Sequence, residues 1–290
     1  MSKLSPAVKA LINAQHARPH AMPVPANIAS VYQQIKSEAQ KRQLTPASWL
    51  ALSTAATVTM NSPASLRVLY QVATHETDTP IEHATATAEF MRETGLKCMS
   101  IIGIPRVINC LNEFRNQLPE TVGARLVTKP TREYHPDNVE GIKARGLDLW
   151  NSIYRPFEKK LIDKLARSHP DMPVIILQNN YAALLSNPEE TSSTDVKGRR
   201  VGRLATSMMA IACLRAQTGC APQVLSHIFG IRKALEDGTW AQDAESQAGA
   251  SWLASDEGNL WILQSVDSIV EAIGQGHGTS FAPPGPRSKL

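Results

Sequence analysis

One stretch in the second half of the chain decides the fold: Arg203-Leu-Ala-Thr-Ser-Met-Met-Ala-Ile-Ala-Cys-Leu-Arg-Ala-Gln-Thr-Gly-Cys-Ala-Pro-Gln-Val-Leu-Ser-His-Ile-Phe-Gly230. Its first part is rich in small residues and predicts a helix. Gly219 interrupts that pattern, and Pro222 suits the first turn of a second helix. On this second helix Gln223 and His227 are four residues apart and therefore share one face.

Helical periodicity continues on both sides of this stretch. The apolar residues between Ile28 and Lys41 fall on one helical face. Thr45, as a possible N-cap, and Pro46 predict a helix that runs to about Met60. A third pattern spans 137–168, where Pro156 is expected to break or kink the helix. Period-two runs of β-branched residues are nearly absent, so the sequence predicts an all-α protein.

The second half shares a layout with the first. Asn61-Ser-Pro-Ala-Ser-Leu-Arg-Val-Leu69 and Cys220-Ala-Pro-Gln-Val-Leu-Ser-His-Ile228 both have proline third and leucine sixth, and each follows a small-residue helix. This predicts two degenerate repeats. We expect an N-terminal helical repeat over 1–128, a C-terminal repeat over 129–280, and a flexible tail over 281–290.

Composition excludes several classes of protein. Of 290 residues, 42% are hydrophobic and 19% are charged, which is typical of a globular chain. The net charge of +4 gives no footprint for nucleic acid, and no apolar run is long enough for a membrane span. The four cysteines lack C-x-x-C spacing and are expected to be reduced thiols.

The stretch from 199 to 230 resembles the alkylhydroperoxidase D-like / carboxymuconolactone decarboxylase family, in which a histidine follows the first cysteine position by seven residues. Cys220 and His227 have this spacing. The segment Gly103-Ile-Pro-Arg-Val-Ile-Asn-Cys-Leu111 looks like one common in fungal members. The resemblance implies a fungal protein with the helical fold of this family, no cofactor, and a closed homo-oligomer.

The sequence departs from the peroxidase branch of that family. Gln223 occupies the place of the second cysteine, and Met208 stands where a glutamate is expected. Because peroxide reduction by disulfide cycling needs a thiolate and a resolving thiol, this chemistry is not expected here. In the first half, Val68 takes the place of His227.

Three functions stay open. The first is a cofactor-free lyase or isomerase acting on a small carboxylated metabolite, with His227 as acid or base and Gln223 as the orienting group. The basic run that ends in Arg199, Arg200 and Arg203 would clamp the anion, although such a run also suits a solvated loop. The second is a non-catalytic scaffold or ligand-binding protein. The third is a thiol antioxidant that uses Cys220.

No metal site is expected. The carboxylate–histidine pairs at 75–76 and 82–83 are separated by Asp78, Thr79 and Pro80, which prevent a helix from aligning them.

The last residues suggest a cellular address. Ser288, Lys289 and Leu290 form the tripeptide recognised by the peroxisomal import receptor, behind a proline-rich spacer that cannot continue a helix. The sequence therefore predicts a protein of the peroxisomal matrix.

Overall fold

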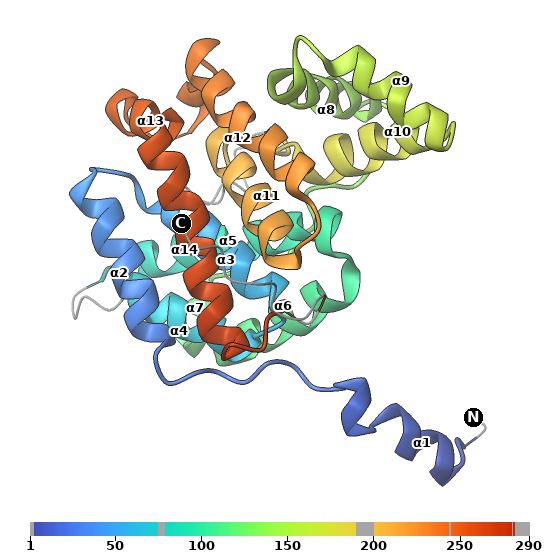
Figure 1. The fold of residues 1–290 in the computed structure, drawn as a ribbon, viewed down its shortest axis with the longest axis vertical. Coiled ribbons are helices and arrows are strands. Elements are labelled where there is room, and N and C mark those ends of the chain that lie inside the picture. Colours follow the sequence, from blue (N-terminus) through green and yellow to red (C-terminus); the bar gives the residue numbers. More distant parts are fainter. Residues whose placement is uncertain (1–2, 75–78, 190–199, 244, 280, 282–290) are drawn as a thin grey trace.

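The computed structural model describes residues 3–74, 79–189, 200–243, 245–279 and 281. Within these ranges every regular element is a helix, which confirms the predicted all-α class (Figure 1). The elements, in chain order, are α1 (Pro6–Ile12), η1 (Gln15–Ala17), α2 (Ile28–Lys41), α3 (Pro46–Thr59), α4 (Pro63–Thr74), α5 (Ile81–Ile102), α6 (Ile104–Gln117), α7 (Glu120–Gly123), α8 (Val139–Tyr154), α9 (Glu158–Ser168), α10 (Met172–Ile175), η2 (Ile176–Leu185), α11 (Arg203–Gln217), α12 (Ala221–Glu236), η3 (Thr239–Gln242), α13 (Gln247–Ala254) and α14 (Asp256–Gly274).

The two small-residue helices, α3 and α11, form the centre of the molecule. They pack on each other more extensively than any other pair of elements, and α5 and α14 contact both of them. In α3 every residue from Ser48 to Thr59 is buried, and in α11 every residue from Arg203 to Leu214 is buried. Alanine, serine and threonine keep both helices thin, so that neighbours approach from all sides.

The N-termini of both central helices are capped by one short segment. Asp243 accepts hydrogen bonds from the backbone N–H groups of Leu204 (2.8 Å) and Ala205 (3.2 Å) at the start of α11. Glu245 accepts from the backbone N–H of Thr45 (3.1 Å) and from the hydroxyl of Ser48 (2.6 Å) at the start of α3. Thr45 occupies the predicted cap position, but the acceptor for the helix start comes from Glu245, 200 residues away.

A second group of helices, α8 to η2, lies beside α12 (Figure 1). The expected break at Pro156 is confirmed, because α8 ends at Tyr154 and α9 begins at Glu158. Gly146 of α8 faces η2 so closely that a Cβ atom there would lie 2.4 Å from the Cα of Ala182. Glycine therefore permits the close packing of α8 on η2, which is a π-helix of ten residues.

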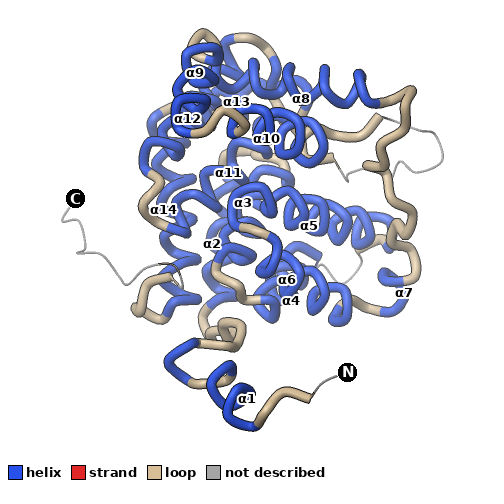
Figure 2. Tube along the Cα trace, turned by 90° about the vertical axis from the view of Figure 1, so that its right-hand side faces the viewer, coloured by secondary structure: helices blue, strands red, loops and turns tan. Residues whose placement is uncertain are grey.

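The N-terminal helix α1 stands apart from the helical body in both views (Figures 1 and 2). It begins with Ser5 as N-cap and Pro6 in the first turn, and none of its residues is buried. The chain joins the body at Met22, whose backbone N–H donates to the carbonyl oxygen of Asn61 (2.8 Å).

The core of the described residues draws on both halves of the chain. Apolar residues of α13 and α14 contribute to this core: Leu253 and Ile262 are fully buried, and Trp261 is 8% exposed. Whether the two halves are repeats stays a prediction, and the import tripeptide lies outside the described residues. None of the described helices combines the length and apolar character needed to cross a bilayer.

Candidate functional site

Arg203 is a buried charge at the start of α11, with a side chain only 2% exposed. Its Nε donates to Oγ of Ser152 (2.8 Å), Nη1 donates to Oγ of Ser207 (2.7 Å), and Nη2 donates to the carbonyl oxygens of Ser152 (3.0 Å) and Gly230 (2.8 Å). Among the described residues none of these acceptors is a carboxylate. Burial lowers the pKa of Arg203 to about 10, so the guanidinium stays charged at neutral pH.

His227 of α12 lies beside this charge and is 7% exposed. Its Nδ1 is buried and has no hydrogen-bond partner among the described residues. Burial, followed by the positive charge of Arg203, lowers the pKa of His227 to about 3. The imidazole is therefore neutral near pH 7, and its buried Nδ1 makes no hydrogen bond to the part of the chain that the structure describes.

An aromatic cluster covers the same region. The hydroxyl groups of Tyr154 and Tyr181 are 2.9 Å apart, and the rings of Tyr154 and His227 meet edge to face at 6.1 Å between centroids. Trp150 contacts both tyrosines. Burial raises the pKa of both tyrosines, so both phenols keep their protons. Four elements thus meet at a buried polar cluster: α8, η2, α11 and α12.

A cavity of about 1050 Å³ lies next to this cluster and includes Arg203 in its lining. We call it the basic cavity, because five cationic side chains line it: Arg145, Arg155, Arg200, Arg203 and Lys233. Three carboxylates, those of Asp148, Glu189 and Asp237, also line it. The excess of positive charge favours an anionic ligand.

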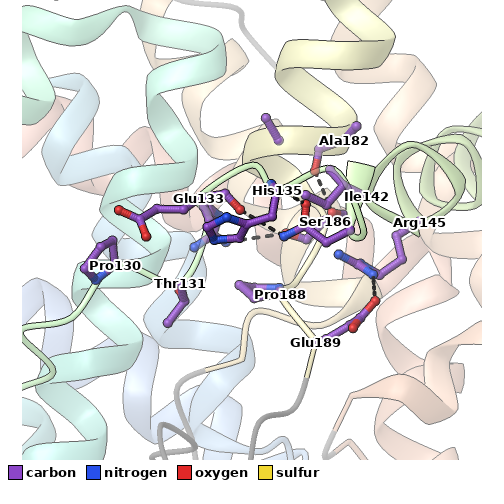
Figure 3. A pocket seen from close by; sticks show the side chains of 13 residues that line it. Pro130, Thr131, Glu133, His135, Ile142, Arg145, Ala182, Ser186, Pro188 and Glu189 are labelled. Atoms are coloured by element: carbon purple, nitrogen blue, oxygen red, sulfur yellow. Dashed lines mark hydrogen bonds and ion pairs between the residues drawn. The ribbon is translucent and has the colours of Figure 1, made fainter. Parts of the chain in front are cut away.

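A smaller polar pocket of about 230 Å³ adjoins the basic cavity and shares four residues with it (Figure 3). His135 and Glu133 from the loop before α8 line one side, and Ser186 and Pro188 line another. Arg145 and Glu189 form an ion pair at the boundary of the two spaces. This pair reduces the free positive charge at that end of the basic cavity.

A buried lysine contacts the lining of the basic cavity from the side of α5. Lys97 of α5 is fully buried, and its Nζ donates to Oδ1 of Asn187 (2.7 Å) and to the carbonyl oxygen of Val201 (3.3 Å). Both partners line the basic cavity. Burial lowers the pKa of Lys97 to about 7, despite the opposing influence of Glu93. Lys97 therefore ties α5 to the two chain segments that border the cavity.

The structure places the sequence-predicted residues in different surroundings. Arg203 and Arg200 both line the basic cavity, and His227 is close enough to Arg203 to feel its charge. Gln223 is exposed on the first turn of α12. Cys220 is half-buried and lines a different groove, which lies between α12 and α14. Arg199 lies outside the described residues. Of the predicted set, Arg200 and Arg203 thus share the lining of one cavity, whereas His227 lies beside Arg203 and is not part of that lining.

Several residues of this site carry no local sequence signal. Tyr154 and Tyr181 are aromatic residues within ordinary helical patterns, and Lys97 sits among small and apolar residues of α5. Their burial depends on packing between elements that are far apart in the chain. Within the described ranges no group of three or more potential ligands is placed to hold a metal ion.

Comparisons with known proteins give one similarity. Peroxisomal protein 2 of Saccharomyces cerevisiae is 27% identical over 188 residues, which cover 58% of this chain and 61% of that protein. The match thus spans less than two thirds of the yeast protein. No family model matches the chain. No solved structure matches it either.

Proposed function

We propose that this chain is a peroxisomal protein that binds a small organic anion in the basic cavity. The observation that carries the proposal is Arg203. Its charge is buried, none of its hydrogen bonds within the described ranges goes to a carboxylate, and it lines a large cavity with four other cationic side chains. Removing a charge from water is costly; the nearby charges of Asp237 and Asp243 offset part of that cost, and an anionic ligand would offset more of it.

The peroxisomal location rests on two independent observations. The tripeptide Ser288-Lys289-Leu290 matches an import signal, and the yeast relative carries a peroxisomal name. A fluorescent protein fused in front of the chain should collect in peroxisomes, and deletion of the tripeptide should return it to the cytosol. Peroxisomal fluorescence that survives the deletion would show that the tripeptide is not the signal.

Anion binding is tested directly with simple carboxylates. We expect acetate, malonate or succinate to raise the melting temperature and to give a saturable signal in calorimetry. Arg155→Gln and Lys233→Gln should each weaken binding by about tenfold, which corresponds to the loss of one charge-assisted hydrogen bond. Lys159→Gln, an exposed change outside the cavity lining, is the matched control. Equal affinities for all three variants and the unmodified protein would contradict the proposal.

Acid–base catalysis by His227 is the second candidate, and its free Nδ1 is the observation in its favour. An imidazole with a pKa of about 3 is a weak base, but an anion bound beside it would raise that pKa. A lyase or isomerase of this kind should exchange the proton on the carbon next to the ligand carboxylate for deuterium in D₂O. Exchange that continues unchanged in His227→Leu would exclude His227 as the base.

The thiol function stays a prediction. Cys220 is half-buried and lies in the groove between α12 and α14 rather than in the basic cavity. A test is the detection of a sulfenic acid on Cys220 after treatment with peroxide.

A further inference from the structure

The chain contains two apolar surfaces that lack a partner in the described structure. One is on α1 and the segment before it, where Leu4, Val8, Leu11 and Ile12 are 56%, 45%, 67% and 57% exposed. Val8, Leu11 and Ile12 are spaced by three and four residues and form one stripe on α1, and Leu4 precedes the N-cap Ser5. The seven residues of α1 are too few for a stable helix in water without tertiary packing.

The other surface is a groove of about 990 Å³ between α12 and α14, which we call the apolar groove. Leu225 of α12 and Leu260 of α14, both 55% exposed, line it together with Val224, Ile228, Leu263 and Val270. From Leu260 to Val270 the groove follows α14 for about 15 Å, and α1 is about 10 Å long. The groove is therefore long enough to take the whole of α1.

Polar groups flank the groove in the manner of a protein interface. Ion pairs between Arg215 and Asp267 and between Arg232 and Asp256 lie on its lining, around the apolar residues. The carboxylates of Asp256 and Asp267 are 90% and 53% exposed, more than the guanidinium groups of their partners. The N-terminal segment is basic, since it contains Lys3, Lys9 and Arg18 and no acidic residue before Glu38. Its cations can therefore contact the carboxylates that face outward from the groove.

The connection to the body allows α1 to reach a neighbour. Met22 is fixed by hydrogen bonds to the α3–α4 turn, and the nine residues between it and Ile12 can extend to about 30 Å. In the structure this segment carries α1 away from its own body (Figure 1).

We propose that α1 docks as an amphipathic helix into the apolar groove of a second copy of this chain. Val8, Leu11 and Ile12 then supply the spaced anchors of a helix-in-groove contact. Reciprocal exchange of the two arms gives a symmetric dimer with two identical contacts. The contact removes both exposed apolar surfaces from water.

The first test is sedimentation of the full-length protein over a range of concentrations. The unmodified chain should dimerise, and both Leu11→Asp on the arm and Leu260→Asp in the groove should raise the dissociation constant by at least about 100-fold, since each buries a charge in each of two contacts. Both positions are exposed in the single chain, so neither change should impair folding. Ala10→Asp, on the opposite face of α1, and Gln264→Asp, an exposed position of α14 outside the groove, are the matched controls.

A mixing experiment then shows whether the arm acts between two copies. Leu11→Asp keeps an intact groove, and Leu260→Asp keeps an intact arm, so their mixture can form one of the two contacts. We expect a heterodimer in the mixture that neither variant forms alone. Three results would each overturn the proposal: an unmodified chain that stays monomeric, a dimer that survives both substitutions, or a mixture that stays monomeric.

Discussion

The two central helices have the same architecture but differ in the polar groups that they bury. In the middle of α3 these groups are neutral: the Tyr32 hydroxyl is 2.6 Å from Oγ1 of Thr57, which itself donates to the carbonyl oxygen of Ser53. The buried carboxylate of Glu245 lies only at the first turn of this helix. Around α11 they include the charge of Arg203 and the unpartnered nitrogen of His227. Hydroxyl groups are easily satisfied inside a helix bundle, whereas a buried charge is costly.

The difference bears on where a ligand would bind. The buried guanidinium and the histidine that folding keeps neutral are both on the α11 side, and the guanidinium lines the basic cavity. Perturbed titratable groups next to a cavity are typical of functional sites. The α11 side is therefore where we expect ligands, and the α3 side is where we expect tolerance of apolar substitution.

We expect the largest loss of stability for Arg203→Ala, which tests whether the charged group on the α11 side matters more than the neutral groups beside α3. The change leaves the carbonyl oxygens of Ser152 and Gly230 without their donors and opens a space in the core. We expect the free energy of unfolding to fall by about 3–5 kcal/mol, measured by urea denaturation. Because an anion would stabilise the unmodified protein through this residue, added succinate should widen the gap between the two proteins. A loss below 1 kcal/mol would show that the guanidinium contributes little to the core.

His227 predicts a pH dependence. Its pKa is about 3 in the folded protein and 6.5 in the unfolded chain, so the unfolded state binds the proton more readily. Its contribution to stability is complete above pH 6.5 and is lost as the pH falls toward 3. At pH 4 this one residue should cost about 3 kcal/mol relative to pH 7.

His227→Leu isolates that contribution, because it removes the titrating group and keeps an apolar side chain. Urea titrations at pH 7 and pH 4 should show a smaller acid-induced loss in His227→Leu than in the unmodified protein. The exposed His83→Leu is the control, and it should follow the unmodified protein. Parallel curves for all three proteins would show that His227 is not buried as a neutral group.

Two substitutions test how strongly the stability of α3 and of α11 depends on the segment that caps both helices. Asp243→Ala removes the acceptor at the start of α11, and Glu245→Ala removes the acceptor at the start of α3. Each should lower the melting temperature, through a loss of about 1–2 kcal/mol. A much larger loss for one variant would identify the helix that limits the stability of the whole protein.

The smallest effect is expected on the α3 side. Tyr32→Phe removes one hydroxyl, and Oγ1 of Thr57 keeps its bond to the carbonyl oxygen of Ser53. The expected loss is about 1 kcal/mol by urea denaturation. A loss as large as that for Arg203→Ala would mean that the polar groups around α3 and those around α11 contribute equally to the free energy of unfolding.

Periodicity was sufficient to predict much of the fold. The helix over Ile28–Lys41, the helix that begins at Pro46, and the break at Pro156 all depend on local signals, and all three are confirmed. The cap from Glu245 was not predictable, because a carboxylate 200 residues away leaves no trace in the local sequence.

The candidate site was predictable only where residues lie close together in the chain. The basic run and the motif around His227 indicated part of it. Arg200 and Arg203 line the basic cavity, and their role in binding stays a prediction. The alternative interpretation of the basic run was a solvated loop. For Arg203 this is wrong, because its side chain is buried in the centre of the bundle. Lys97, Tyr154 and Tyr181 reach the site through tertiary packing, which a single sequence does not reveal.

The segment that holds Asp243 and Glu245 also bears on how the protein unfolds. Its carboxylates fasten the first turns of two helices that are about 160 positions apart in the chain. Neither helix can fray at its start without loosening the same short connection, so their local openings are linked. In hydrogen exchange, the amide protons of Thr45, Leu204 and Ala205 should therefore become labile together, as members of one cooperative unit.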